Sequence, residues 1–260
     1  MPPERQVYLL DPKNLSPETI AVTFAKTSRS PQRFIEIAAE LTDEKSAEFH
    51  EKWVVGYGHA SVAEHAVLHI AVENISRLAV ESLESCRLAS YTEKSTRYQK
   101  WGKEDYHHPE ELQNHPLQSL YQDTVLSLFT AYEEALPKIR QVIQQKYPAR
   151  DGESEAAWER RIRSKYVDIA RFYLPAAALA NVGVTINARA LEHTLTKMLS
   201  HPLSEVRHIG EEMKAVAQAN VPTLVKYATP LPYLQHTPQQ LQSLAAHVKE
   251  NTLPSDWCRL

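Results

Sequence analysis

Residues 109–170 are the feature that most constrains the fold, because they form one long stretch of Leu, Ala, Glu, Gln, Lys and Arg at helical spacing. Tyr147 and Pro148 open a loop that reaches Ser154, so the stretch predicts long helices on either side of this loop. Residues 65–75 (HAVLHIAVENI) differ from this pattern, since they form an apolar run typical of a buried strand. The fold must therefore combine a buried strand with long helices.

Shorter elements are predicted on both sides of this region. Ser16 and Pro17 are suited to the N-cap and first position of a helix that reaches about Lys26. Further helices are predicted at residues 33–41, at 43–54 after a Thr42 cap, and at 78–87, 187–199 and 204–219. The remaining predictions are a short strand at residues 7–10, a polar irregular segment at 90–95, an extended segment at 96–101, and a proline-containing tail with one short helix near the C-terminus.

Composition excludes several classes of protein. The net charge of -3 gives no overall basic field for nucleic acid, and no apolar run approaches the ~18–20 residues of a membrane helix. Two cysteines and the lack of a secretory pattern at the N-terminus favour a cytoplasmic protein. Only 6 glycines occur and none forms a phosphate-binding loop, so any nucleotide must be held by side chains and helix ends.

Three segments carry side chains suited to anion binding. Residues 85–98 (SCRLASYTEKSTRY) hold two arginines ten residues apart, which could bracket a phosphate or could belong to an ordinary solvated loop. Asn187 and Arg189 stand at the head of a predicted helix, where Asn is also a common N-cap. Arg171 precedes a Leu-Pro helix stop and could equally pair with a carboxylate in the core. Each segment is weak evidence alone.

A fourth segment contains His59, Ser61, His65 and His69. The last two histidines are four residues apart, which on a helix could bind zinc. On the predicted strand they would lie about 13 Å apart, too far for one ion, and no third ligand has suitable spacing. No metal site is therefore expected.

The ordered combination of these segments resembles the flavin-dependent thymidylate synthase family over roughly residues 1–220. Residues 61–65 (SVAEH), 73–77 (ENISR) and 87–98 (RLASYTEKSTRY) resemble the family's signature region, which reads Arg-His-Arg, seven residues, then Ser, usually followed closely by Arg-Tyr. Residues 170–175 and 187–191 resemble its second block in order and spacing. The resemblance implies an α+β fold, with a sheet and a large helical portion, for residues 1–220, followed by a proline-containing extension at 221–260.

The resemblance also implies an activity, namely the reductive methylation of dUMP to dTMP in a homotetramer that binds FAD between subunits. NADPH would reduce the flavin, and methylenetetrahydrofolate would donate the carbon. By the same resemblance, the FAD contacts would be His59, Ser61, Arg87, Glu93, Asn187, Arg189 and His193. The nucleotide contacts would be Ser82, Ser85, Glu93, Lys94, Ser95, Thr96, Arg97 and Arg171, and the catalytic residues would be Lys197, Ser95 and Arg97.

Several positions depart from the family pattern. Ser85 and Cys86 replace the Arg-His of the signature, Ser82 replaces a glutamine, and His193 replaces a second asparagine. Glu81 and Glu84 add negative charge beside a site meant for anions. These changes keep open an alternative, a divergent paralogue that binds FAD or nucleotide but makes no dTMP or methylates a different pyrimidine.

The position of the family's ring-polarising arginine has two interpretations. Counting forward from Asn187 gives Met198, whereas counting backward from His201 and Glu205 gives Lys197, because the chain is one residue shorter in between. One residue rotates a helix by ~100°, so the two interpretations place different side chains at the ligand. Lys197 keeps a cation there, and Met198 removes it.

Overall fold

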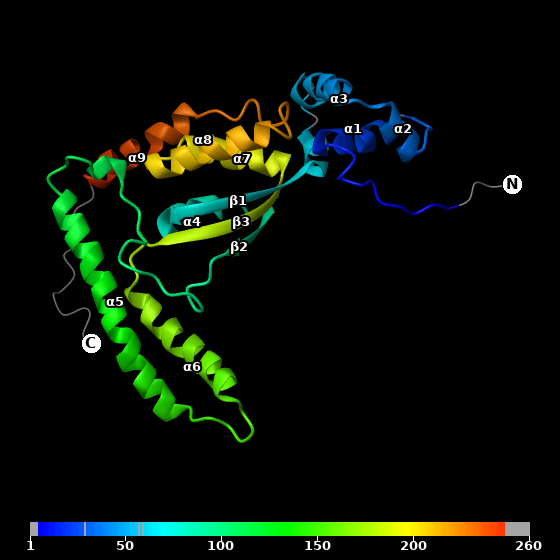
Figure 1. Ribbon diagram of the computed structural model, residues 1–260. Helices are drawn as coiled ribbons and strands as arrows, with labels where there is room; N and C mark the ends of the chain where they lie inside the picture. Colours follow the sequence, from blue (N-terminus) through cyan, green and yellow to red (C-terminus); the bar gives the residue numbers. More distant parts are fainter. Residues whose placement is uncertain (1–4, 29, 57, 59, 248–260) are drawn as a thin grey trace.

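The centre of the computed structural model is a three-stranded antiparallel sheet (Figure 1). The structure describes residues 5–28, 30–56, 58 and 60–247. β3 (Leu179–Asn187) lies between β1 (Val67–Ser76) and β2 (Ala89–Glu93), so the spatial order is β1-β3-β2. The sheet and the many helices confirm a mixed α+β fold, and β1 confirms the strand predicted at residues 65–75.

The register of the sheet defines two ends that matter for function. Val67 pairs with Asn187 at one end, which we call the Asn187 end. Ser76 pairs with Leu179 at the other, the Leu179 end. β2 spans only part of this length, from the pair Ala89↔Ile186 to the pair Glu93↔Val182.

Three helices form the main core with the sheet. They are α4 (Arg77–Leu83), α7 (Ala188–Leu199) and α8 (Ser204–Gln218), and Figure 1 shows α7 and α8 lying along the sheet. On α7 the fully buried Leu191, Leu195 and Met198 recur at helical spacing, so one face packs into the core. The predicted α7 and α8 are confirmed.

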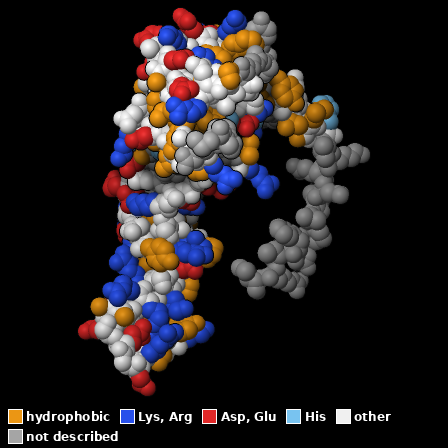
Figure 2. Space-filling model, turned by 90° about the vertical axis from the view of Figure 1, so that its right-hand side faces the viewer, with side chains coloured by type: hydrophobic (Ala, Val, Ile, Leu, Met, Phe, Trp, Pro, Cys, Tyr) orange, Lys and Arg blue, Asp and Glu red, His pale blue; other side chains and the backbone are white. Residues whose placement is uncertain are grey.

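A helical hairpin forms a second core, away from the sheet. α5 (Gln118–Lys146) and α6 (Glu155–Ala170) extend from the body as an arm, visible in both overall views (Figures 1 and 2). Phe129 and Tyr132 of α5 pack against Ile162 and Val167 of α6, all fully or nearly fully buried. The two helices predicted within residues 109–170 are confirmed.

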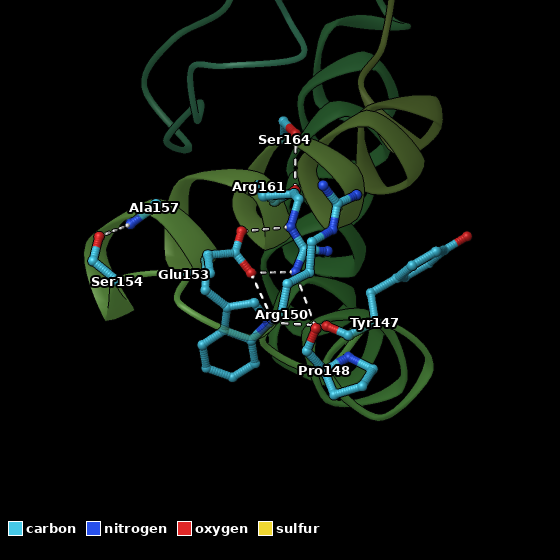
Figure 3. A network of polar contacts seen from close by, with 9 residues as sticks. Tyr147, Pro148, Arg150, Glu153, Ser154, Ala157, Arg161 and Ser164 are labelled. Atoms are coloured by element: carbon cyan, nitrogen blue, oxygen red, sulfur yellow. Dashed lines mark hydrogen bonds and ion pairs between the residues drawn. The ribbon is translucent and has the colours of Figure 1, made fainter.

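The loop at the tip of this arm is fixed by a polar network (Figure 3). Arg161 donates to Glu153 at 2.8 and 2.6 Å and to the Pro148 carbonyl at 3.0 Å, and Trp158 donates to the Tyr147 carbonyl at 2.9 Å. The Arg161 guanidinium holds the pKa of Glu153 at about 2. The loop predicted from Tyr147 to Ser154 is therefore held in place by hydrogen bonds from Trp158 and Arg161 of α6.

A cap of short helices precedes the sheet. It contains α1 (Pro17–Thr27), α2 (Phe34–Glu40), α3 (Asp43–Phe49), a π-helix (His50–Gly56) and a 3₁₀ turn (Ala60–His65). Ser16 and Thr42 cap α1 and α3 as predicted. Buried Glu18 on α1 accepts the N–H groups of Thr223 and Leu224, at 2.9 and 3.3 Å, which ties the cap to a distant segment.

The chain returns to the main core after residue 220. Val221, Leu224, Val225 and Ala228 are buried there, and α9 (Pro232–Ala245) then follows with no buried residue. The division into residues 1–220 and 221–260 stays a prediction about where an extension begins.

Four local predictions are wrong. Residues 7–10 form no strand, and Val7 and Leu9 are each 92% exposed because no neighbouring strand covers them within the described residues. Residues 90–95 mostly form β2, since pairing with β3 organises a polar segment. Residues 96–101 begin with a turn, and the helix predicted at 78–87 ends at Leu83.

Candidate active site

The predicted nucleotide contacts begin at the end of β2. Glu93 is the last residue of the strand, and the N–H of Lys94 extends the pairing to the Asn181 carbonyl at 2.8 Å. Ser95 then closes a turn, since its hydroxyl accepts the Arg97 N–H at 3.3 Å and its carbonyl accepts the Gln99 N–H at 3.1 Å. The turn carries Thr96 and Arg97 toward the end of α6.

One carboxylate joins two predicted nucleotide contacts. Asp168 Oδ1 lies 3.3 Å from Arg97 Nε and 3.0 Å from Arg171 Nε. Arg171 also donates to Thr96 Oγ1 at 3.1 Å, and Thr96 is buried. Thr96 and Arg97 therefore share one cluster at the Leu179 end with Arg171, which lies 75 positions beyond Thr96, and Asp168 positions the two guanidinium groups.

A cavity of about 410 Å³ opens on this cluster. Thr96 and Arg171 line it together with Arg77, Glu81 and Phe172. Two guanidinium groups and a hydroxyl at one cavity are suited to a phosphate, because guanidinium groups bind phosphate oxygens bidentately. Arg77 belongs to a segment that resembles the family, but the sequence predicted no role for it. Its position directly after the N-cap Ser76 places Arg77 at the start of a helix, where anions are favoured.

Carboxylates moderate this positive charge. Arg77 forms an ion pair with Glu93. Burial raises the pKa of Glu84, and the nearby negative charges of Glu93 and Glu81 raise it further. Glu84 therefore interacts electrostatically with both Glu81 and Glu93, and the negative charge predicted from Glu81 and Glu84 lies beside this cluster.

The altered signature lies in the turn between α4 and β2. Ser85 and Arg87 are exposed, and Cys86 is a partly buried free thiol packed against the main core. Tyr91 fixes the turn, because its hydroxyl lies 3.0 Å from the Cys86 carbonyl, and burial raises the pKa of Tyr91 to about 12. Arg87 has no ion pair or hydrogen bond with any described residue.

Most of the predicted flavin contacts that the structure describes lie near the Asn187 end, whereas Glu93 lies toward the Leu179 end, paired with Arg77. Asn187 caps α7, accepting the Ala190 N–H at 2.8 Å, and this use of its side chain is structural. Arg189 forms an ion pair with Glu64, and both side chains are about half exposed. His193 is exposed on the same helix, whereas His59 lies outside the described residues.

A second cavity, of about 590 Å³, adjoins these residues. Ser61 and Glu64 line it with the aromatic side chains of Phe24, Phe49 and Trp53. Phe24 packs against His65 with ring centroids 5.0 Å apart. Aromatic walls with a polar rim suit a planar heterocycle, so the donors and rings present fit a flavin nucleotide, and Arg189 stands beside the cavity through its pair with Glu64.

The structure places the two candidates for the ring-polarising position on different faces of α7. Met198 is 2% exposed within the main core, where it packs against α8 near Gly210. Lys197 is exposed on the last turn of α7. The next residues return to α4, since Ser82 Oγ lies 3.4 Å from His201 Nε2. Of the two, only Lys197 presents a side chain that a ligand could reach.

The two clusters are separated along β3. Lys94 pairs with Asn181 and the flavin candidates begin at Asn187, six residues later. At about 3.3 Å per residue the separation is roughly 20 Å.

The zinc hypothesis has no support in the described residues, where no group of three or more His, Cys, Asp or Glu could hold a metal ion.

Comparison with known proteins identifies the family of the chain. Residues 10–223 match the family model described as thymidylate synthase complementing protein. The chain belongs to this family. It is 31% identical to a UPF0159 protein of Chlamydia muridarum over 83% of the chain but only 44% of that protein, so it spans less than half of that relative's length. It is 29% identical to a flavin-dependent thymidylate synthase of Clostridium tetani, covering 83% of each.

Solved structures of two family relatives have the same fold. One is the flavin-dependent thymidylate synthase ThyX of Helicobacter pylori, complexed with FAD and dUMP, with a TM-score of 0.53 at 18% identity over 82% of this chain and 96% of that one. The other is the UMP/dUMP methylase PolB of Streptomyces cacaoi, bound with 5-Br dUMP, with a TM-score of 0.54 at 19% identity over 80% and 88%. At these identities the likeness shows the fold alone. Among the described residues, no helix is long and apolar enough to cross a membrane.

Proposed function

We propose that this family member is an FAD-dependent methylase of a uracil nucleotide, with dUMP as substrate, methylenetetrahydrofolate as carbon donor and NADPH as reductant. The observation that carries the proposal is the cavity lined by Arg77, Thr96 and Arg171, which brings predicted nucleotide contacts together around anion-binding groups. Family membership supports the same class of reaction.

The residues at the Leu179 end hold and orient the nucleotide. Arg171 and Arg97 neutralise the phosphate, with Asp168 fixing the angle between their guanidinium groups. The Ser95 turn and Lys94 place donors beside the sugar and base. Ser82 and Ser85 stay predicted contacts of the nucleotide, and Glu93 would lie between nucleotide and flavin. These roles orient a substrate in the manner that lowers the entropic part of a barrier.

Lys197 would stabilise the negative charge that develops on the uracil ring. An ammonium group aimed at developing charge can contribute several kcal/mol in a site that excludes water, about 3 kcal/mol by analogy with oxyanion donors. Ser95 and Arg97 would assist by holding the ring and phosphate in register. No cysteine nucleophile is required in this scheme.

FAD would be held at the Asn187 end by Ser61, Arg87, Asn187, Arg189 and His193. Glu93 and His59, the latter outside the described residues, stay predicted contacts of the flavin. Bound and reduced, the flavin supplies the hydride that completes the methyl group. Phe24 and Trp53 offer ring faces to a planar group, and Arg189 offers charge to its phosphates.

The separation of the two ends supports a site that is completed by a second copy of the chain. Flavin and uracil must touch for hydride transfer, yet their candidate residues lie roughly 20 Å apart along β3. The Asn187 end of one copy facing the Leu179 end of another would form a complete site, which is the arrangement expected of the predicted homotetramer. The cytoplasmic location and the lack of a nucleic-acid partner stay predictions from composition.

The deciding experiment is a flavin-binding titration followed by fluorescence, with and without dUMP, and then a turnover assay with methylenetetrahydrofolate and NADPH. The proposal expects FAD binding that dUMP tightens, and dTMP as product. FAD binding without turnover on dUMP would favour the alternative, a divergent paralogue with another pyrimidine substrate or none. Failure to bind both FAD and dUMP would overturn the proposal.

A further inference from the structure

A third cavity, of about 510 Å³, belongs to neither cluster described above. It lies beside the cavity lined by Arg77, Thr96 and Arg171, which we call the nucleotide cavity. It is enclosed by the start of α5, the loop that contains the 3₁₀ turn Glu110–Leu112, and residues 175–177. Its walls are mainly apolar, formed by side chains that include Leu78, Leu112, Leu120, Val125, Leu128 and Leu203. Apolar cavities of several hundred Å³ with a few polar groups are the usual form of small-molecule sites.

The polar groups that line this cavity include two carboxylates, a histidine and several hydroxyl groups. Glu205 accepts both the N–H and the hydroxyl of Ser76 at 2.6 Å, and His107 Nδ1 lies 3.5 Å from it. Glu111 accepts the Ser204 N–H at 2.6 Å. These hydrogen bonds fix the positions of both carboxylates, as a binding site requires.

Two carboxylates dominate the charge of the cavity, and a histidine is paired with one of them. Burial acts to raise the pKa of Glu111, but the hydrogen bonds from Ser204 and the positive charge of Arg207 outweigh burial and lower the pKa below its ordinary value. The described residues that line the cavity include two carboxylates and no lysine or arginine. A positively charged group would therefore complement the cavity, and an anion would be repelled.

We propose that this cavity binds a small molecule with a compact apolar body and one protonated amine, with the amine directed at Glu111 and Glu205. The apolar walls favour burial of the body, and the fixed carboxylates select the head group. This ligand differs from the nucleotide in charge, since the neighbouring cavity carries Arg77 and Arg171.

The two cavities share a wall, which gives the site a consequence for the neighbouring one. Leu78, Pro175 and Ala176 line both. Leu78 directly follows Arg77 at the start of α4, so a ligand that fixes Leu78 also restrains a guanidinium of the nucleotide cavity. Amine binding should therefore change nucleotide affinity, and the nucleotide should change amine affinity by the same factor.

Three probes that share one apolar cage test the head-group preference on the full chain. Calorimetric titration at pH 7 would compare 1-adamantylamine, 1-adamantanol and 1-adamantanecarboxylate. The amine is expected to bind at least about tenfold more tightly than the carboxylate, with the alcohol between them. Equal affinities, tightest binding of the carboxylate, or no binding of the amine would overturn the proposal.

Two matched pairs of variants locate the binding. Thr124 and Thr130 lie on α5 and each donates its hydroxyl to the carbonyl four residues earlier, but only Thr124 lines the cavity. Thr124→Trp should fill the cavity and abolish amine binding, whereas Thr130→Trp should not. Glu111→Gln keeps an acceptor for Ser204 and should reduce the preference for amine over alcohol, because one of the two carboxylates is lost, whereas Glu110→Gln should leave the preference unchanged.

A second copy of the chain is the competing occupant. Sedimentation at a series of protein concentrations, with and without 1-adamantylamine, separates the two cases. Amine binding that is independent of the state of association supports the proposal. Amine binding only to dissociated protein would assign the cavity to a subunit interface and overturn it. Neither result depends on FAD or dUMP, so the test stands apart from that of the proposed methylase activity.

Discussion

The two ends of the sheet differ in how much of a site each one completes. At the Leu179 end, Thr96, Arg97 and Arg171 meet around Asp168 and open on a cavity. At the Asn187 end, the charged candidates point outward, with Arg189 about half exposed and Arg87 exposed. The first end is assembled by several contacts within one chain, whereas the cations of the second end are exposed at the surface.

This difference bears on where the chain departs from the family pattern. Residues of the Leu179 end are fixed by several partners, so a change there would leave Asp168 or Thr96 without its partner. Ser85 and Cys86 instead lie in a turn whose backbone is held by Tyr91 whatever the side chains are. We therefore expect the contacts around Asp168 to tolerate substitution less well than the turn that contains Ser85 and Cys86.

Removal of Lys197 should give the largest effect. Lys197→Met should lower dUMP turnover by at least about a hundredfold, about 2.7 kcal/mol, while FAD and dUMP still bind. The measurement is the rate of dTMP formation together with both binding titrations. Lys197→Arg, which supplies the family's arginine, is the control and should keep turnover. Unchanged turnover in Lys197→Met would mean that another group stabilises the ring.

Loss of Arg171 tests the Leu179 end. Arg171→Ala removes a charge-assisted contact worth about 2 kcal/mol, so dUMP affinity should fall roughly thirtyfold with little change for FAD. Calorimetry with each ligand makes the comparison, and Arg163→Ala should leave both affinities unchanged, because Arg163 is exposed on α6, the helix that ends just before Arg171, and lies outside the cavity. An equal loss for both ligands would show that the two ends do not act separately.

The Asn187 end is tested by Arg189→Ala and Arg87→Ala. Each should weaken FAD binding about tenfold, ~1.4 kcal/mol, with dUMP affinity in the absence of flavin unchanged. Flavin fluorescence titration reports the change. If neither variant affects FAD, the assignment of flavin to this end is wrong.

The smallest effect concerns the charge of Glu84. Burial and the charges of Glu93 and Glu81 raise the pKa of Glu84, so Glu84 loses its charge at a higher pH than a free carboxyl does as the pH falls. Glu84→Gln should therefore bind dUMP about twofold more tightly at pH 7.5, roughly 0.5 kcal/mol for a charge several Å away in water. The advantage should shrink at pH 5.

Deoxyuridine is the matched ligand for this test, because it lacks the phosphate. Its affinity should not respond to Glu84→Gln at either pH. A gap between variant and wild type that widens as the pH falls would contradict the sign of the effect.

Local sequence patterns predicted most helices, because their apolar side chains recur at helical spacing and their caps are marked by Ser16, Thr42 and Asn187. They did not predict β3, whose sequence (LANVGVTIN) mixes small, polar and apolar residues. They also left β2 as a polar loop. Both strands owe their structure to pairing with distant partners, which no local window contains.

The site was predicted in part for the same reason. Family resemblance could name Arg171 and Thr96, but only the fold shows that they bond to each other, that Asp168 joins them, and that Arg77 lines the same cavity. The choice between Lys197 and Met198 depended on which face of α7 is buried, and burial places Met198 in the core.

The strand order β1-β3-β2 has a consequence for the order in which the chain can fold during its synthesis. The first two strands to emerge do not pair with each other, and both wait for β3, which begins at Leu179. The cap waits longer still, because the partners of Glu18 lie 205 and 206 residues further along. Contacts of such separation slow folding, and the unpaired edges of β1 and β2 stay open to other chains until most of the protein has been made.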